Sequence, residues 1–371
     1  SSTSRGLGDV YKRQVYYIKD NSGNGQVASD HTKSKKCTLK DIVRRSDLSC
    51  AAVSQILNNR GGAFTSEATK KLVRSIAEEL GYKQNFSHKL QRGDRTNTVA
   101  LLMSLPRLEW EQHIQSLSMH LTELCNTKEY ATYVFHMTLS PGRNLEIIEK
   151  LIERGTDHFI LIGLPKGHGK VISRIEALNR SWIAYGNHRL IKRQVGVDVE
   201  NGTTQILQYF REHGISDFKM FLPGRSERIS ALKAFYPECT DQELHDRYLC
   251  IDKAFEEPLH SGETIIVQLA EIGYRQTRKL LETSSPPQAL VYLSDYTMQG
   301  GIRALYESGI IPGRDVVLAG FNNTAAVQGS PFRLISVDQN IEQVAGELFA
   351  HLFDDSPCRI KVAPALKLNW I

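Results

Sequence analysis

Apolar side chains recur every three or four residues, in three short runs between residues 38 and 81. This spacing predicts three amphipathic helices. We expect the three helices to start at hydroxyl residues, which are Thr38, Ser49, and Thr65 or Ser66. We expect the third helix to end at Gly81. A tight break at residues 47–49 is typical of a helix-turn-helix unit, although any small three-helix bundle would show the same periodicity.

From residue 98 onward, short apolar runs alternate with helical patterns such as 145–154, 203–213 and 298–308. The runs predict strands at 99–103, 131–135, 159–163, 182–185, 195–199, 218–222, 289–293 and 316–321, and 366–371 is also strand-like. This alternation predicts an α/β body with parallel sheets. About 270 residues exceed one comfortable sheet, so we expect two similar lobes with a cleft between them.

Charge is unevenly distributed along the chain. Residues 32–95 hold 14 Lys and Arg against 6 Asp and Glu, a surplus of eight positive charges, whereas residues 96–371 carry a net charge of −4. A small basic head on a mildly acidic body is typical of a polyanion-binding module joined to a separate sensor, although a basic solvated surface would give the same count.

Several classes of protein are disfavoured. We find no apolar run long enough for a membrane span and no signal peptide, and the six cysteines are scattered without metal-ligand spacing. We therefore expect reduced thiols, a cytoplasmic protein and neither metal nor cofactor. The common hydrolase, metalloprotease, phosphate-loop and dinucleotide motifs are missing, and the glycine-rich 163–169 is interpreted as a loop tip, so we predict no enzyme.

Two segments of the head resemble the LacI/GalR regulators nearly position for position. They are TLKDIVRRSDLSCAAVSQILNN and TSEATKKLVRSIAEELGYKQN. The resemblance implies a helix-turn-helix DNA-binding domain. It places Cys50, Ala51 and Gln55 at base-reading positions, where Ala51 could touch only a thymine methyl and Gln55 could pair with adenine. The alternative is that these three are simply exposed helix residues.

The same resemblance assigns contacts to the DNA backbone or the positioning of the head to further residues. Their hydroxyl and amide groups reach phosphate oxygens without reading sequence. The set is Ser49, Ser54, Asn58, Thr69, Tyr82 and Asn85, and Thr38 and Ala52 complete the DNA-binding residues.

The connection to the body departs from the family pattern. Gln84 replaces the usual Pro, and the segment is one residue short. The resemblance makes Leu90 the residue that inserts into the minor groove, although Leu90 could instead pack against the core. The expected organisation is a disordered leader over 1–35, partly foreign to the fold, a DNA-binding domain over 36–84, a hinge over 85–97 and a two-lobed core over 98–371.

The body resembles the periplasmic-binding-protein-like core of the same family more faintly, through QALVYLSDYTMQGGIRALYESGIIPGRDVVLAGFNN and GVDVENGTTQILQYFREHGISDFKMFLPG. The resemblance implies ligand contacts by Trp110, Arg228, Asp295 and Asn322. Ser294 and Asn322 stand where relatives carry Asn and Asp, which changes the hydrogen-bonding chemistry. The alternatives are a surface ion pair for Arg228, a helix cap for Asp295 and core packing for Trp110.

The resemblance therefore implies a homodimeric regulator, expected to be a repressor, that binds a palindromic operator. It also implies that a small effector such as a sugar controls this binding. Without a heptad tail, a dimer is expected rather than a tetramer. Two alternatives stay open: a regulator that has lost its effector, and a solute-binding protein.

Overall fold

The computed structural model describes residues 37–57, 66–82, 95–104, 112–224, 226–256, 264–354 and 356–370. The chain divides into two compact units, Ser1–Asn85 and Phe86–Ile371. The predicted leader over 1–35 and most of the predicted hinge over 85–97 lie outside the described residues, so both remain predictions. Four site residues also lie outside them: Asn58, Asn85, Leu90 and Trp110.

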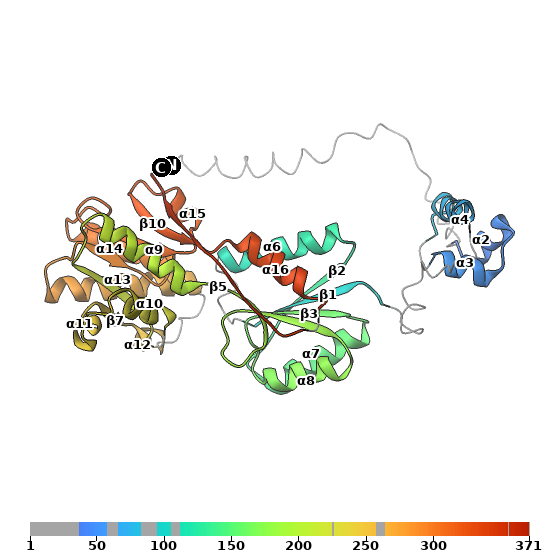
Figure 1. The fold of residues 1–371 in the computed structure, drawn as a ribbon, viewed down its shortest axis with the longest axis horizontal. Coiled ribbons are helices and arrows are strands. Elements are labelled where there is room, and N and C mark those ends of the chain that lie inside the picture. The colour runs from blue at the N-terminus through green and yellow to red at the C-terminus, as the bar shows by residue number, and fades with distance from the viewer. Residues whose placement is uncertain are drawn as a thin grey trace, which may run out of the picture. The chain divides into compact units, whose positions relative to one another are not determined.

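The first unit contains the three predicted helices, α2 (Leu39–Ser46), α3 (Cys50–Leu57) and α4 (Glu67–Glu79) (Figure 1). Local polar groups fix where they begin. The Thr38 amide and hydroxyl both donate to the Asp41 carboxylate, at 2.8 and 2.7 Å. Ser49 accepts from the Ala52 amide at 3.2 Å, which caps α3. Their apolar faces meet in one buried cluster of Ile42, Val53, Ile56, Val73, Ile76 and Ala77.

The second unit is built on two six-stranded sheets, which define two lobes. The sheet of lobe 1 has the order β11-β5-β4-β3-β1-β2, and every paired strand in it is parallel. Its strands are β1 (Thr98–Met103), β2 (Ala131–His136), β3 (His158–Ile162), β4 (Ser181–Tyr185), β5 (Arg193–Val197) and β11 (Cys358–Val362). Its helices are α6 (Gln112–Thr127), α7 (Pro141–Glu153), α8 (His168–Ala177) and α16 (Ile341–His351).

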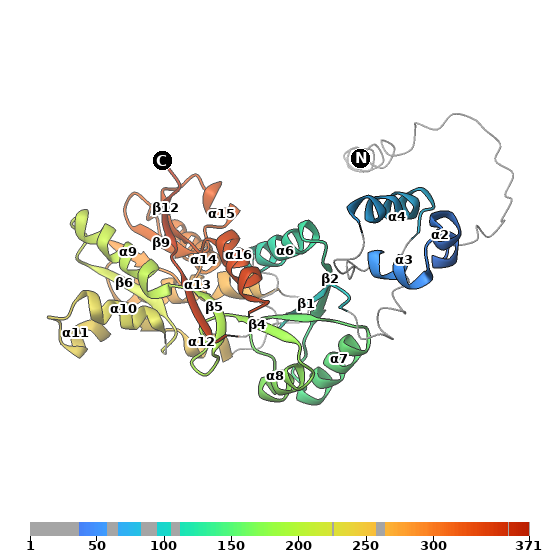
Figure 2. The same cartoon turned by 45° about the vertical axis from the view of Figure 1, so that its right-hand side comes forward.

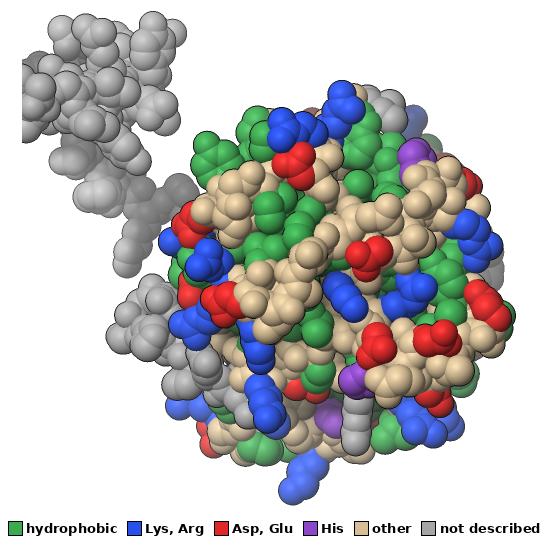
Figure 3. Space-filling view, turned by 90° about the vertical axis from the view of Figure 1, so that its left-hand side faces the viewer, with side chains coloured by type: hydrophobic (Ala, Val, Ile, Leu, Met, Phe, Trp, Pro, Cys, Tyr) green, Lys and Arg blue, Asp and Glu red, His purple; other side chains and the backbone are tan. Residues whose placement is uncertain are grey.

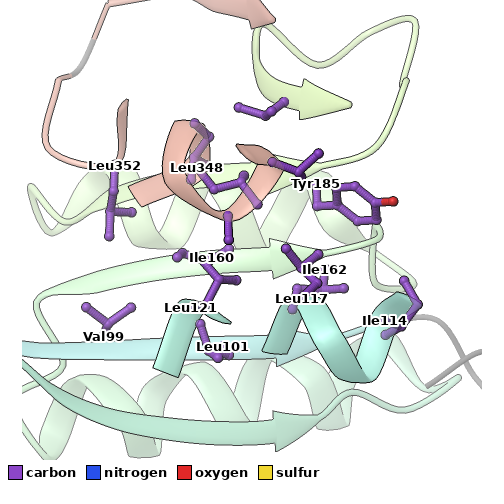
Figure 4. Close-up of a cluster of buried hydrophobic side chains, with 14 of the residues drawn as sticks. Val99, Leu101, Ile114, Leu117, Leu121, Ile160, Ile162, Tyr185, Leu348 and Leu352 are labelled. Atoms are coloured by element: carbon purple, nitrogen blue, oxygen red, sulfur yellow. The ribbon is translucent and has the colours of Figure 1, made fainter. Parts of the chain in front are cut away.

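Successive side chains along each strand point to opposite faces of this sheet, so each face packs into its own hydrophobic core. Val99 and Leu101 pack with α6 and α16, whereas Ala100 and Leu102 pack with α7 and α8. Figure 4 shows the first core, where Leu117 and Leu121 of α6 and Leu348 and Leu352 meet the strand residues Leu101 and Ile160. A sheet buried on both faces explains why its strands read as continuous apolar runs.

Lobe 2 repeats this three-layer arrangement with the order β12-β10-β9-β8-β6-β7. Its strands are β6 (Phe218–Leu222), β7 (Tyr248–Cys250), β8 (Ala289–Val291), β9 (Val317–Phe321), β10 (Leu334–Asp338) and β12 (Ala365–Leu368). Its helices are α9 (Val199–Glu212), α10 (Glu227–Phe235), α11 (Asp241–His245), α12 (Asp252–Glu256), α13 (Ile265–Thr283), α14 (Asp295–Glu307) and α15 (Ala325–Gln328). Helices α9 and α10 cover one face, and α13 and α14 cover the other (Figure 2).

The chain passes between the lobes three times, at β5 to α9, β10 to α16 and β11 to β12. The two predicted lobes of a mostly parallel α/β body are therefore confirmed. Four details of the prediction were wrong or incomplete. The strand expected over 195–199 ends at Val197, because Asp198 caps α9. His168 is not in a loop tip but begins α8. β7, β10 and β11 were not predicted, and β12 pairs antiparallel to β10.

Candidate functional site

The outer face of α3 is the first candidate site. Ser49, Cys50, Ala51 and Gln55 are exposed, whereas Val53 and Ile56 of the same helix are buried. Residues 50, 51 and 55 follow helical spacing, so they share one side of α3 and leave the head core on the other. The helix therefore presents a thiol, a methyl group and an amide to whatever approaches it.

The remaining head residues of the predicted DNA interface surround the helix ends. Thr38 precedes α2, and Thr69 lies in the first turn of α4, where its amide is bonded to Ser66 at 3.2 Å. Ala52 and Ser54 are half-buried on α3. Tyr82 follows Gly81, whose φ of +59° ends the third helix as expected, and packs against the head core.

The positive surplus of the head comes from its sequence as a whole, because in the described head residues basic side chains pair with acidic ones. Arg44 is mostly exposed on α2, and Arg45 pairs with Glu79 of α4 at 2.6 Å. On the face of lobe 2 in Figure 3, Lys and Arg side chains are interspersed with Asp and Glu. The sequence surplus of positive charge thus falls on the unit that carries α3.

The second candidate site lies where four adjacent parallel strands of lobe 2 end. Arg228 follows β6, Asp295 follows β8, Asn322 follows β9 and Gln339 follows β10. Carboxyl ends of parallel strands meet at one edge of a sheet, which is where α/β proteins place their ligands. This edge also contacts lobe 1, because the Tyr185 hydroxyl, at the carboxyl end of β4, donates to Gln339 Oε1 at 3.4 Å.

Arg228 lies inside the protein. The residue is 7% exposed, and its guanidinium carbon lies 3.7 Å from the ring centroid of Phe321. The alternative of a surface ion pair is therefore wrong. A guanidinium stacked on an aromatic ring keeps its edge donors in one plane, a geometry that suits hydroxyl or carboxylate groups of a ligand.

Asp295 is fully buried, and its carboxylate joins three segments of lobe 2. It accepts from the Thr324 amide at 2.7 Å and from the Ser336 hydroxyl at 2.6 Å. The alternative that Asp295 caps the following helix is wrong, since Ser294 is the N-cap of α14. These bonds favour a structural role for Asp295, in which it holds together the segments at the carboxyl ends of the lobe 2 strands. Contact of Asp295 with a ligand stays a prediction.

Asn322 adopts a φ of 99° directly after β9, and its side-chain oxygen accepts from Gln339 Nε2. Gln339 thus touches Asn322 of lobe 2 and Tyr185 of lobe 1 together. Asn187 of lobe 1 also donates to Glu227 at 3.0 Å, beside Arg228. Sequence reasoning missed Gln339 and Glu227. The apolar run before Gln339, at residues 334–337, was the available signal.

Two protein families match the chain. Residues 38–85 match the bacterial regulatory proteins of the lacI family, and residues 207–356 match the periplasmic binding protein-like domain. The HTH-type transcriptional repressor MelR of Bacillus subtilis (strain 168) is 23% identical over 312 residues, which cover 82% of this chain and 87% of MelR. The regulator TreR of Salmonella typhimurium is 23% identical over 321 residues, covering 86% and 93%.

Solved structures agree on the fold. A lac repressor dimer bound to operator and the anti-inducer ONPF has a TM-score of 0.67 at 15% identity, covering 90% of this chain and 99% of that one. The complex of the regulator CelR with cellobiose has a TM-score of 0.59 at 18% identity, covering 90% and 98%.

Among the described residues, no helix is both long and apolar enough to cross a membrane. The head carries the helix-turn-helix, the body carries the two-lobed core, and the relatives that span both are regulators of transcription. The chain thus carries a lacI-family helix-turn-helix domain and a periplasmic-binding-protein-like domain, and over most of its length it is similar to regulators of transcription.

Proposed function

We propose that the protein is a cytoplasmic, homodimeric repressor that binds a palindromic operator through α3 and releases it when a small polar effector binds at the carboxyl edge of lobe 2. The observation that carries the proposal is the pairing of an exposed α3 face on a basic head with a polar edge between the lobes. No catalytic step and no cofactor is part of it.

The head is suited to reading bases in the major groove. Gln55 offers an amide that can pair with adenine, and Ala51 beside it offers a methyl group to thymine. Ser49 and Thr69 lie at helix starts, where hydroxyls and amides favour phosphate oxygens. The proposal also includes insertion of Leu90 into the minor groove, which rests on the family resemblance alone.

The polar side chains at the carboxyl ends of the lobe 2 strands favour a ligand rich in hydroxyl groups. Arg228 supplies donors, and Asn322 and Gln339 supply both donors and acceptors. The amide of Asn322 in place of a carboxylate suits a polyhydroxyl ligand, because an amide can both accept from and donate to hydroxyl groups. Trp110, which would stack on a sugar face, belongs to this proposal on the resemblance alone.

Dimerisation is supported by exposed apolar side chains at one edge of lobe 1. β2 is the last strand of its sheet, with Val134 47% exposed, and Met119 on α6 is 72% exposed. An uncovered edge strand with apolar side chains favours association with a second copy.

Val134→Lys is expected to raise the dimer dissociation constant at least about 10-fold, since burying one unpaired ammonium in an interface costs more than about 1.4 kcal/mol. Sedimentation equilibrium measures it. Leu190→Lys is the matched control, because Leu190 is 85% exposed and lies in the loop beside β11, at the other end of the sheet. Equal dissociation constants for the two variants would exclude this face.

Selection of random duplexes by the full chain at two salt concentrations tests the proposed function. A palindrome should be enriched, and affinity should fall as salt rises because bound Lys and Arg displace counterions. Salt-dependent binding without an enriched sequence would leave only general DNA binding.

A regulator without an effector is the second candidate, favoured by Ser294 and Asn322 in place of the family's residues. A thermal-shift panel of monosaccharides, cellobiose and sugar phosphates separates the two. A ligand at 100 times its Kd stabilises the folded state by about 2.7 kcal/mol. A panel without any shift, and without any change in operator binding, would favour the second candidate.

A further inference from the structure

The carboxylate of Asp157 lies at the amino end of the lobe 1 sheet, directly before β3. The residue is 3% exposed. One oxygen accepts from the amides of Thr96 and Asn97, at 2.7 and 2.9 Å. The Thr96 hydroxyl oxygen lies 3.2 Å from the same oxygen, but its single proton goes to the nearer Gly155 carbonyl. The other oxygen accepts from Arg180 Nη1 at 2.8 Å. A single buried carboxylate thus accepts from three N–H donors.

Two of those donors belong to the residues that lead from the linker into the core. Thr96 and Asn97 come just before β1, and they follow the segment that joins the DNA-binding head to lobe 1. Two neighbouring segments also hold this one: the Thr96 hydroxyl donates to the carbonyl of Gly155, in the turn before β3, and the Asn97 carbonyl accepts from the amide of Ala131 in β2 at 2.8 Å. Asn97 has a φ of 54°, so the chain turns sharply at this point.

The anchoring depends on charge. Hydrogen bonds to a buried carboxylate are roughly twice as strong as neutral ones. Removing the carboxylate takes the acceptor from the amides of half-buried Thr96 and exposed Asn97, and it leaves Arg180 without its partner, so these residues gain by moving further into water. Residues 95–97 are then expected to detach before the strand itself does, because they lie outside the regular pairing of β1 with β2 and β3.

We propose that Asp157 fixes the point at which the linker enters lobe 1, and that this fixed point sets the spacing of the two operator half-sites. The inference rests on the proposed dimeric operator binding. If residues 95–97 detach, each linker gains three residues, which is up to roughly 10 Å of reach. One base pair adds about 3.4 Å to the separation of the half-sites. Three added residues per linker therefore exceed the extra reach that one inserted base pair demands, so detachment is expected to relax the spacing preference.

The experiment compares full-length variants on the selected palindrome and on duplexes with one or two base pairs inserted at its centre. The measured quantity is the ratio of the two dissociation constants. The wild-type protein is expected to prefer the selected spacing at least about 10-fold. In Asp157→Ala this preference is expected to fall to within about 3-fold, while a hydrogen-exchange peptide covering residues 95–104 exchanges at least about 10-fold faster.

Asn144→Ala is the matched control. Asn144 is fully buried in lobe 1, and its side chain bonds the Thr138 amide at 2.7 Å and the Lys166 carbonyl at 3.1 Å, away from the linker. It should keep the wild-type spacing preference at a comparable loss of stability. Asp157→Asn keeps an oxygen for the two amides but removes the charge and the ion pair with Arg180, so it should restore only part of the preference.

If Asp157→Ala does not fold, Thr96→Val removes only the Thr96 hydroxyl, which contacts Gly155, Thr98 and Asp157, and should give an intermediate loss of preference. An unchanged spacing preference despite faster exchange in residues 95–104 would overturn the inference, as would unchanged exchange. A wild-type protein that enriches no palindrome would instead refute the proposed dimeric operator binding.

Discussion

Gly300→Ala is expected to lower the free energy of unfolding by about 3 kcal/mol or more. The backbones of helices α13 and α14 approach each other closely at Gly300. A methyl group on Gly300 would lie 1.7 Å from the Ala270 carbonyl oxygen and 2.6 Å from the Tyr274 amide nitrogen. Gly273 meets the Thr297 carbonyl in the same way, at 1.8 Å. Both neighbours are backbone atoms, which cannot rotate aside, so the helices must separate.

Gly346→Ala is the matched control for this prediction. Gly346 also lies inside a helix, α16, but a methyl group there would have no neighbour within 4 Å. Its substitution should be neutral or stabilising by up to about 1 kcal/mol, because alanine favours helix. Urea unfolding followed by circular dichroism measures both variants. A similar effect of the two substitutions would mean that the close approach of α13 and α14 does not limit stability.

Gln55→Ala is expected to weaken binding to the selected operator by about 10- to 100-fold, since a good bidentate contact to a base contributes about 1–3 kcal/mol. Gln55 is exposed on α3, opposite the buried Val53 and Ile56. Its removal leaves the head core intact, so binding to unrelated DNA should stay unchanged. Fluorescence anisotropy with the operator and with a scrambled duplex measures the two affinities.

Two further variants sharpen this second prediction. Gln55→Arg should move the preference at one position of each half-site from adenine toward guanine, because arginine pairs with guanine. Gln208→Ala removes an exposed glutamine from α9 in lobe 2 and should leave both affinities unchanged. Equal loss of operator and scrambled-duplex binding in Gln55→Ala would show that Gln55 contacts phosphates rather than bases.

The head could be predicted from local patterns because each of its signals acts within a few residues. Thr38 bonds Asp41 three residues on, Ser49 caps α3, and Gly81 ends the third helix with a left-handed φ. Most strands of the body that are buried on both faces were recognisable as apolar runs, although β10, which is also buried, was missed. β7 was missed because it has only three residues and none of them is buried, and β11 because it reads as alternating polar and apolar residues at the edge of its sheet.

The sequence predicted which residues of the body form the candidate effector site, but not how those residues are arranged in space. Local sequence is enough to determine the helix-turn-helix, the strand–helix alternation and which side chains face outward on α3, since these follow from periodicity and capping. Only the tertiary structure decided that Arg228 is buried on Phe321, that Asp295 bonds Thr324 and Ser336, and that Asp157 holds Thr96. Those partners lie 29 to 93 residues apart in the chain, so their contacts depend on how strands assemble into sheets, and neither spacing nor composition encodes that directly.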